Sequence, residues 1–389
     1  MQQGWGVFWR ETIFVWKDAP LLPILNGWAL LIPGLSPIFA CRGTVVVMAA
    51  IGALFLWGIT RNWWVLIFYL LNPFNFFIDR TSLMESVFVT MVLFYLWTVL
   101  RGKKFLSIAA VGLLFAAKQS ALIALPFPWL LEGKLKKNTL ITMGLGVFFA
   151  VLLKLTTPLW DTAQMHVSVV VDISRIKQNL WLMENWIIQY LEWPGMLVVV
   201  LGGVMAVHKR RFGVISILVL IGGVYGFTGF RLFPRYLLVM MPFMAMLVGE
   251  VAKYKWGKIS IALVLLIFIH KDWMILTAPK GAAIAKEDHY QFWEDWSSGL
   301  GTKAAVDYLR GENYSGSLWV PQDLKGMWII TQLSYAPGRR WDEHFYTLAE
   351  EIGKSGWIIN TSHHQIKRGE LVFVSNGEAR NSVRIEKIP

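Results

Sequence analysis

The sequence predicts an α-helical polytopic membrane protein with a C-terminal extracytoplasmic α/β domain. Hydrophobic residues make up 56% of the 389 positions, and the chain holds 21 Trp and 24 Phe. Apolar runs of about 20 residues, the length with which a helix crosses roughly 30 Å of hydrocarbon, recur as far as residue 278. Beyond that point the apolar runs are short and alternate with turn residues. We therefore predict a multi-pass membrane domain at 1–278 and a soluble extracytoplasmic α/β domain at 279–389.

The beginning of the chain, residues 1–19, is aromatic but too short to span a bilayer. Residues 1–19 carry two carboxylates, Glu11 and Asp18, among several Trp side chains. Because Trp favours the headgroup level, this segment is predicted to lie at the membrane interface. Residues 20–33 are apolar over about 14 positions, a length that favours a re-entrant or interfacial helix.

Further apolar segments are candidates to span the membrane. They lie at 38–60, 63–78, 83–100, 105–117, 121–131, 139–157, 195–208, 212–229, 236–252 and 259–277. Two of them, 105–117 and 121–131, are short, and Pro126 and Pro128 are expected to break the second. Irregular backbone at membrane depth is tolerated where it is packed in protein or lines a cavity. The expected total is about 10–11 membrane helices.

The basic residues indicate the orientation. Of the 24 Lys and Arg residues in 1–278, 13 fall in turns on one side of the predicted helices. These turns contain Arg61, 101–104, Lys134, Lys136, Lys137, 209–211, Lys253, Lys255 and Lys258. The positive-inside rule places that side in the cytoplasm and the C-terminal domain outside. Residues 280–389 hold 13 basic and 14 acidic residues, so the basic excess belongs to the membrane domain and does not indicate nucleic acid.

The stretch Asn72 to Glu85, NPFNFFIDRTSLME, places charged residues between two apolar segments. A charge at the bilayer centre costs roughly 3 kcal/mol or more, so Asp79, Arg80 and Glu85 are expected at a membrane face or in a wet cavity, where they mark a site. Other charged or titratable residues on the predicted outer side are Glu11, Asp18, Lys118, Asp161, His166, Arg231 and Arg235. We therefore expect any chemistry to face outward.

The segment 158–194 is amphipathic and rich in Trp. It is predicted to lie on the outer leaflet, where it either gates the access of lipid or substrate or simply rests on the bilayer. After residue 278, a helix is predicted at 303–310. Strands bounded by Gly, Asn and Asp are predicted at 317–321, 356–360, 371–375 and 382–388.

Four motifs occur in the order and spacing of one family. They are KDAPLLPILNGWALLIPG followed by Arg42, NPFNFFIDRTSLME, GLLFAAKQSALIALP and RLFPRYLLVMMP. Together, over about Glu11 to Leu247, the chain resembles the GT-C superfamily of polyprenyl-phosphate-sugar glycosyltransferases. It looks most like the branch that includes protein O-mannosyltransferases and the lipid A aminoarabinose transferase. The C-terminal domain is similar to that of many such enzymes.

The resemblance implies a catalytic carboxylate in the first external loop that acts as base on the acceptor. Asp18 or Glu11 would supply it, since KDAPLL stands where the family usually has KPPL. Glu85 is similar to the family's second acidic residue, just after an arginine that Arg80 matches. Family members usually begin with a transmembrane helix and an acidic residue farther upstream, and this chain begins about where that loop should end. The choice of base among Asp18, Glu11 and Glu85 therefore stays open.

The resemblance also implies a donor site. Lys118 is similar to the lysine that contacts the donor phosphate, and Arg235 with Tyr236 matches an Arg-Tyr pair near the same group. From the residues themselves, Lys118, Arg231 and Arg235 are suited to stabilise the negative charge that develops on a leaving phosphate. Direct attack opposite that phosphate would invert the anomeric centre. No cofactor is required; a divalent metal ion stays possible but is not indicated.

The implied partners are a polyprenyl-phosphate-linked sugar donor, a lipid, glycan or protein acceptor, and the bilayer of a plasma or inner membrane. Several residues have purely structural alternatives: an Asp79–Arg80 ion pair that stabilises a turn, snorkelling of Lys118, and anchoring of lipid phosphates by Arg231 and Arg235. Two other classes stay open, a non-catalytic membrane scaffold and a transporter. The transporter is disfavoured because the charges collect at one face and no repeat is evident.

Overall fold

The computed structural model describes most of the first three-quarters of the chain and the strands of the remainder. The described residues are 21–29, 31–33, 35, 37–81, 83–134, 136–156, 172–228, 232–278, 281–289, 308, 317–321, 342–346, 356–361, 370–374 and 383–388. The chain divides into two compact units. One comprises Met1–Gly34 and Phe39–Ala285, and the other comprises Leu35–Ile38 and Lys286–Pro389.

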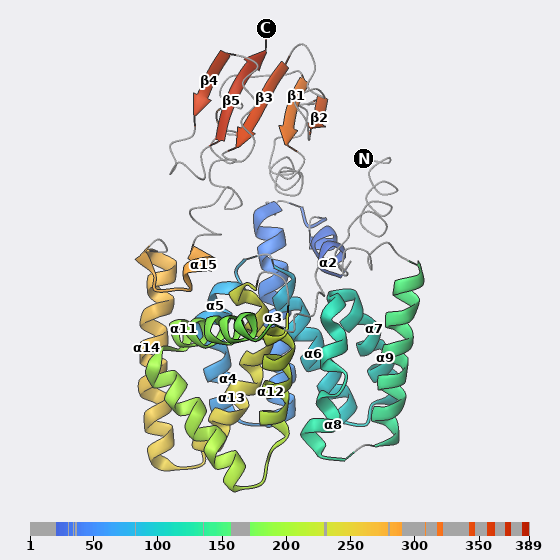
Figure 1. Ribbon diagram of the computed structural model, residues 1–389, viewed down its shortest axis with the longest axis vertical. Helices are drawn as coiled ribbons and strands as arrows, with labels where there is room; N and C mark the ends of the chain where they lie inside the picture. The colour runs from blue at the N-terminus through green and yellow to red at the C-terminus, as the bar shows by residue number, and fades with distance from the viewer. Residues whose placement is uncertain are drawn as a thin grey trace. The chain divides into compact units, whose positions relative to one another are not determined.

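The larger unit is helical (Figure 1). Its α-helices are α2 (Leu21–Ala29), α3 (Pro37–Thr60), α4 (Trp63–Leu70), α5 (Pro73–Ile78), α6 (Met84–Leu100), α7 (Lys104–Ala117), α8 (Phe127–Glu132), α9 (Lys137–Thr156), α11 (Ile173–His208), α12 (Gly213–Gly226), α13 (Met241–Val251) and α14 (Lys255–Thr277). Two 3-10 helices, η2 (Gln119–Ala124) and η3 (Pro234–Met240), precede α8 and α13. The short helix α15 (Lys286–His289) follows in the second unit.

Four helical segments in the described part are long and apolar enough to cross a membrane. They are Phe39–Thr60, Ile173–His208, Pro234–Val251 and Lys255–Thr277. Shorter apolar helices of 10–17 residues accompany them, among them Met84–Leu100 and Gly213–Gly226. These segments give the chain the character of a multi-pass membrane protein, as the sequence predicts.

The span predicted at 63–78 is wrong as a single helix, because the structure breaks it into α4 and α5. Pro73 has no N–H to donate to a preceding turn, which disfavours an uninterrupted helix. Asn72 adopts an extended conformation instead, and its side-chain oxygen accepts a hydrogen bond of 2.9 Å from the Phe74 N–H. This is an N-cap, so a new helix begins at Pro73. The break predicted within 121–131 is present, between η2 and α8.

Helix α11 is 36 residues long and contains a kink. Glu192 has a φ of 56°, which is not helical, and Pro194 follows it. In Figure 1 the first arm of α11 runs across the neighbouring helices, whereas the second arm runs along them. The first arm belongs to the amphipathic segment predicted at 158–194, of which 157–171 lies outside the described residues. The predicted span at 195–208 is the second arm.

Close helix packing forms the core. Helix α6 is buried along almost its whole length, and Tyr95 near its middle donates a hydrogen bond of 2.9 Å to the Leu125 carbonyl. Helices α11 and α13 approach each other at Gly202, where a Cβ would lie 2.2 Å from the Leu247 carbonyl oxygen. A glycine is therefore required there. Phe74 stacks on Tyr190 with ring centroids 4.3 Å apart, which attaches α5 to the first arm of α11.

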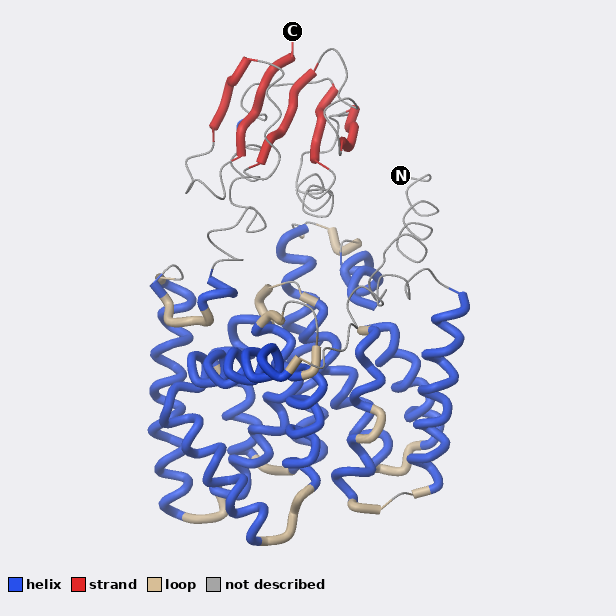
Figure 2. The backbone as a smooth tube through the Cα atoms, viewed as in Figure 1, coloured by secondary structure: helices blue, strands red, loops and turns tan. Residues whose placement is uncertain are grey.

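The second unit contains a five-stranded sheet (Figure 2). Its strands are β1 (Ser317–Pro321), β2 (Asp342–Tyr346), β3 (Gly356–Thr361), β4 (Glu370–Val374) and β5 (Val383–Ile388), in the order β2-β1-β3-β5-β4. Strand β1 pairs in parallel with β2 and β3, and β5 pairs antiparallel with β3 and β4. Four strands match predicted ones. Strand β2 was not predicted, because its residues DEHFY lack an apolar alternation. Of the helix predicted at 303–310, only Tyr308 is described, and it is helical.

Candidate functional site: a carboxylate between two cations

Three side chains from distant parts of the chain meet at one end of the helical unit. Helices α6 and α7 are antiparallel neighbours joined by the short turn at 101–103, so the start of α6 and the end of α7 lie at the same end. Glu85 lies in the first turn of α6, and Lys118 is the residue after α7. Arg235 lies in the first turn of η3, which packs against α6.

The Glu85 carboxylate is the centre of this cluster. Lys118 Nζ donates a hydrogen bond of 3.2 Å to Glu85 Oε1. Arg235 Nε lies 3.5 Å from the same oxygen. The exposed fractions of the three side chains are 7% for Glu85, 16% for Lys118 and 18% for Arg235. The structure thus brings two cations to one buried carboxylate oxygen, in surroundings where charges interact more strongly than in water.

Aromatic rings also lie close to the two cations. Lys118 Nζ lies 4.6 Å from the centroid of the Tyr236 ring, and the Arg235 guanidinium lies 4.7 Å from that of Phe233. Tyr236 in turn stacks on Tyr225 of α12, with centroids 6.2 Å apart. Rings at such distances attract a cation through their negative faces. They add attraction without a full negative charge.

The local sequence explains why each side chain is held in place. The backbone of Lys118 is extended, with φ −163° and ψ 142°, so α7 ends at this residue and the Lys118 side chain lies beyond the helix. Pro234 begins η3, where its missing N–H costs nothing, and this places Arg235 in the first turn. The position of Glu85 near a helix N-terminus favours its negative charge.

Asp79 and Arg80 follow α5 but do not join this ion-pair cluster. The Arg80 guanidinium donates a hydrogen bond of 2.7 Å to the Phe76 carbonyl and lies over the Phe76 ring. Within the described residues, Asp79 and Arg80 form no direct ion pair, although their charges attract each other. Although Asp79 keeps part of its surface accessible, burial raises its pKa to about 7, against the opposing charge of Arg80.

Several candidate residues lie outside the described part of the chain. They are Glu11, Asp18, Asp161, His166 and Arg231. Neither of the first-loop carboxylates proposed as the base is therefore placed, and the third candidate base, Glu85, is paired with two cations.

A second group of charged residues, which was not predicted from the sequence, lies where α14 meets the kink of α11. Lys271 donates hydrogen bonds to the Gln189 carbonyl and to the Glu192 carboxylate. The adjacent Asp272 is buried, and neither of its carboxylate oxygens has a hydrogen-bond partner in the described structure. A signal was present in the sequence, because Lys271 and Asp272 interrupt the apolar run predicted at 259–277.

The geometry of the Glu85 cluster suits anion binding. Two cations fixed by a carboxylate and by aromatic rings need little rearrangement to meet phosphate oxygens, and charge-assisted hydrogen bonds from Lys and Arg are strong. Among the described residues, no group of three or more His, Cys, Asp or Glu side chains is arranged to hold a metal ion. Compared with known proteins, the chain matches no family model, no curated protein and no solved structure.

Proposed function

We propose that this protein is a membrane glycosyltransferase of the GT-C type. It would transfer a sugar from a polyprenyl-phosphate donor, dolichyl or undecaprenyl, to an extracytoplasmic lipid, glycan or protein. The single observation that carries the proposal is the meeting of Lys118 and Arg235 at the Glu85 carboxylate. These residues come from three of the motifs that resemble the family, and 150 positions separate the first from the last.

The proposed reaction is a direct displacement. The acceptor hydroxyl oxygen attacks the anomeric carbon, and the bond from that carbon to the phosphate oxygen breaks. The electron pair leaves with the polyprenyl phosphate, whose added negative charge Lys118 and Arg235 stabilise, with Tyr236 supporting Lys118. A carboxylate takes the acceptor proton during attack. Attack opposite the leaving group inverts the anomeric centre, and the cations supply the charge stabilisation without requiring a metal ion or another cofactor.

The geometry favours different roles for the candidate carboxylates. One oxygen of Glu85 already interacts with Lys118 and Arg235, and a proton on that carboxylate would weaken both interactions. Glu85 is therefore better suited to position the two cations than to accept a proton. In this proposal the base is Asp18 or Glu11, and Arg231 assists at the phosphate. Asp79 and Arg80 support the start of α6.

The proposal includes a location and a topology. The protein would lie in the plasma or inner membrane with about 10–11 membrane helices, its C-terminal unit outside. The five shorter apolar helices of 10–17 residues support a number of crossings above four. The start of α6 and the end of α7 meet at the end of this helix pair that lies opposite the basic turn 101–103. This supports a site on the outer side.

Sugar transfer from a radiolabelled polyprenyl-phosphate donor, measured with the purified protein in lipid, tests the proposal. We expect transfer by the wild type and a large loss in Glu85→Gln and Lys118→Ala. Glu250→Gln is the matched control. Glu250 also pairs with several cations, but it lies at the C-terminal end of α13, whereas Arg235 of the Glu85 cluster lies in η3, which precedes α13. Full transfer by both site variants would end the site assignment. If the wild type transfers no sugar from any such donor, the non-catalytic scaffold is the better interpretation.

A further inference from the structure

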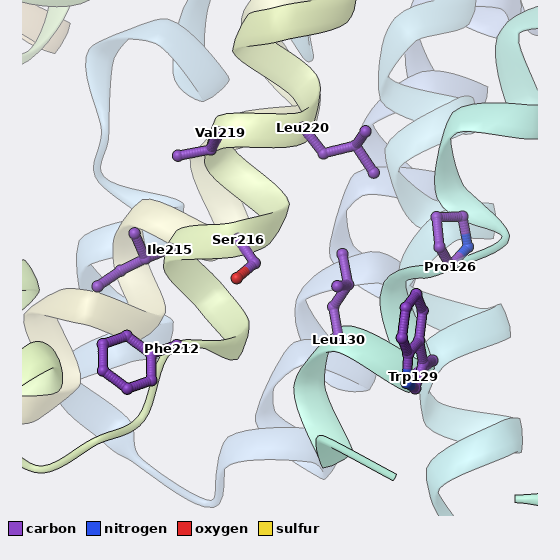
Figure 3. Close-up of a pocket in the computed structure, with 8 residues that line it drawn as sticks. All are labelled: Pro126, Trp129, Leu130, Phe212, Ile215, Ser216, Val219 and Leu220. Atoms are coloured by element: carbon purple, nitrogen blue, oxygen red, sulfur yellow. The ribbon is translucent and has the colours of Figure 1, made fainter. Parts of the chain in front are cut away.

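A groove runs between α8 and α12, away from the Glu85 cluster. Its upper part has a volume of about 500 Å³ and an almost entirely apolar lining, formed mainly by Trp129, Leu130, Val219 and Leu220. Figure 3 shows Leu130 and Leu220 pointing into the space between the two helices. The volume lies within the range typical of small-molecule sites.

The groove changes character at its lower end. There it continues into a pocket of about 650 Å³ whose lining includes Glu132, Arg210, Arg211 and Gly213. Glu132 is the acidic residue of this lining, and its carboxylate pairs with Lys136 at 2.5 Å. The two helices are in close contact at that level, since a Cβ on Gly213 would lie 2.4 Å from the Leu130 carbonyl oxygen. An apolar channel thus ends at a rim with two arginines and one glutamate that is already paired with Lys136. The net positive charge of this rim is complementary to the headgroup of an anionic amphiphile.

Arg210 is the residue of this rim that is available to a ligand. Its neighbours Lys209 and Arg211 both pair with Glu250, whereas Arg210 is exposed and forms no ion pair within the described structure. Arg210 has a φ of 55°, and its N–H donates to the Val207 carbonyl. This left-handed conformation is uncommon for a residue other than Gly or Asn.

We infer that this groove binds an anionic phospholipid from the leaflet on the side of the basic turns. Its acyl chain would lie along Trp129, Leu130 and Leu220, and its phosphate would meet Arg210. The length of the groove agrees with one leaflet. From Phe212 to Leu220 a helix rises about 12 Å, close to half of the roughly 30 Å hydrocarbon core. A lipid with its phosphate at Arg210 therefore has the opposite orientation to a donor whose phosphate is at Lys118.

Lipid binding to the purified full-length protein, counted by native mass spectrometry, tests this inference. The probes are phosphatidylglycerol, which is anionic, and phosphatidylcholine, which is zwitterionic. Arg210→Asn removes the charge and keeps a residue that tolerates positive φ. We expect it to weaken phosphatidylglycerol binding about fivefold, which corresponds to about 1 kcal/mol for one basic residue at a membrane surface, and to leave phosphatidylcholine binding unchanged.

A second variant tests the apolar part of the groove. Ser216 lines it from α12, and Ser216→Phe should obstruct the acyl chain and weaken the binding of both lipids. Lys255→Ala is the matched charge control, since Lys255 is exposed at the start of α14 and lies outside the groove lining. It should bind phosphatidylglycerol as the wild type does.

Three results would overturn the inference. Equal weakening by Arg210→Asn and Lys255→Ala would indicate a diffuse effect of surface charge. Unchanged binding in both Arg210→Asn and Ser216→Phe would exclude the groove. Displacement of phosphatidylglycerol by a polyprenyl phosphate would assign the groove to that lipid instead. None of these readouts depends on sugar transfer, so the inference and the proposed function fail separately.

Discussion

Two carboxylates, Glu85 and Glu250, each gather several cations, and their clusters lie at opposite ends of the segment formed by η3 and α13. Arg235 of the first cluster and Glu250 of the second are 15 residues apart, or about 22 Å along a helix. Glu250 pairs with Lys209 at 3.2 Å, Arg211 at 2.8 Å and Lys253 at 2.6 Å. By number and length of ion pairs, the Glu250 cluster is the stronger of the two.

Burial reverses that ranking. The side chains around Glu250 are 29–61% exposed, while Lys118 and Arg235 are exposed by less than 20%. Exposed ion pairs contribute little because water and salt screen them. Buried charges interact strongly but lose hydration, so such a cluster is costly to keep and is weak evidence for stability. The comparison indicates that the Glu250 cluster is an ordinary surface network and that the Glu85 cluster is a candidate site.

The largest expected effect is on stability. Glu85→Ala leaves the partly buried Lys118 and Arg235 beside each other without their shared carboxylate. Removing one member of a buried ion pair typically costs about 3–5 kcal/mol, and we expect a loss near the lower end because both cations keep some contact with water. The free energy of unfolding in mixed micelles measures this change. Glu250→Ala should cost about 1 kcal/mol or less. Equal costs for the two variants would contradict the distinction between the clusters.

The next effect is on activity. Lys118→Ala removes one of two cations proposed for the leaving phosphate, and loss of one such preorganised group typically lowers the turnover rate by about 10²–10³-fold. Lys209→Ala should leave the rate of sugar transfer unchanged, because Lys209 belongs to the Glu250 cluster. A similar loss in both variants would show that the assay reports protein integrity and not the site.

A third ion pair lies between these extremes and sharpens the comparison. Lys271 is 6% exposed and its partner Glu192 is 38% exposed. Lys271→Met keeps much of the side-chain volume but leaves the Gln189 carbonyl without its donor at the kink of α11. We expect a loss of about 1–3 kcal/mol in the free energy of unfolding, the usual contribution of a hydrogen bond from a charged group. A loss as small as that of Glu250→Ala would show that one exposed partner is enough to screen the pair.

Whether a feature could be predicted depends on how far apart in the sequence its interacting residues lie. The apolar runs predicted the membrane class, and charged residues among them identified Glu85, Lys118 and Arg235 as site candidates. The break at Asn72 was missed because its cap depends on a local side-chain hydrogen bond, although Pro73 was a visible signal. The family resemblance implied that Lys118 and Arg235 lie near one donor phosphate, with Glu85 as a further site residue. The ion pairs that join both cations to the Glu85 carboxylate were not predicted, since they require the relative placement of α6, α7 and η3. The Lys271–Glu192 pair was missed for the same reason.

Asp79 offers a test by pH at the same end of the molecule as Glu85. Its pKa rises from 3.8 to about 7 through burial, so between these values the unfolded chain loses the proton before the folded protein does. The contribution of Asp79 to the free energy of unfolding should therefore be largest below about pH 4 and fall by about 1–2 kcal/mol as the pH rises to about 7. This fall is smaller than the full pKa shift implies, because the Asp79 side chain stays partly accessible to water. Asp79→Asn should remove this fall. The free energy of unfolding of the wild type and of Asp79→Asn, measured at pH 5 and pH 8, tests this prediction.

The smallest effect concerns salt, and it tests the comparison most directly. At 1 M salt the screening length is about 3 Å, so the ion pairs of Glu250, which are open to water, should lose most of their contribution. The cost of Glu250→Gln, about 1 kcal/mol or less in dilute salt, should then approach zero. The cost of Glu85→Gln should change little, because ions of the solution do not reach between Lys118 and the carboxylate. If both costs fall together, the Glu85 cluster is open to solvent, and the case for a preorganised phosphate site loses its physical basis.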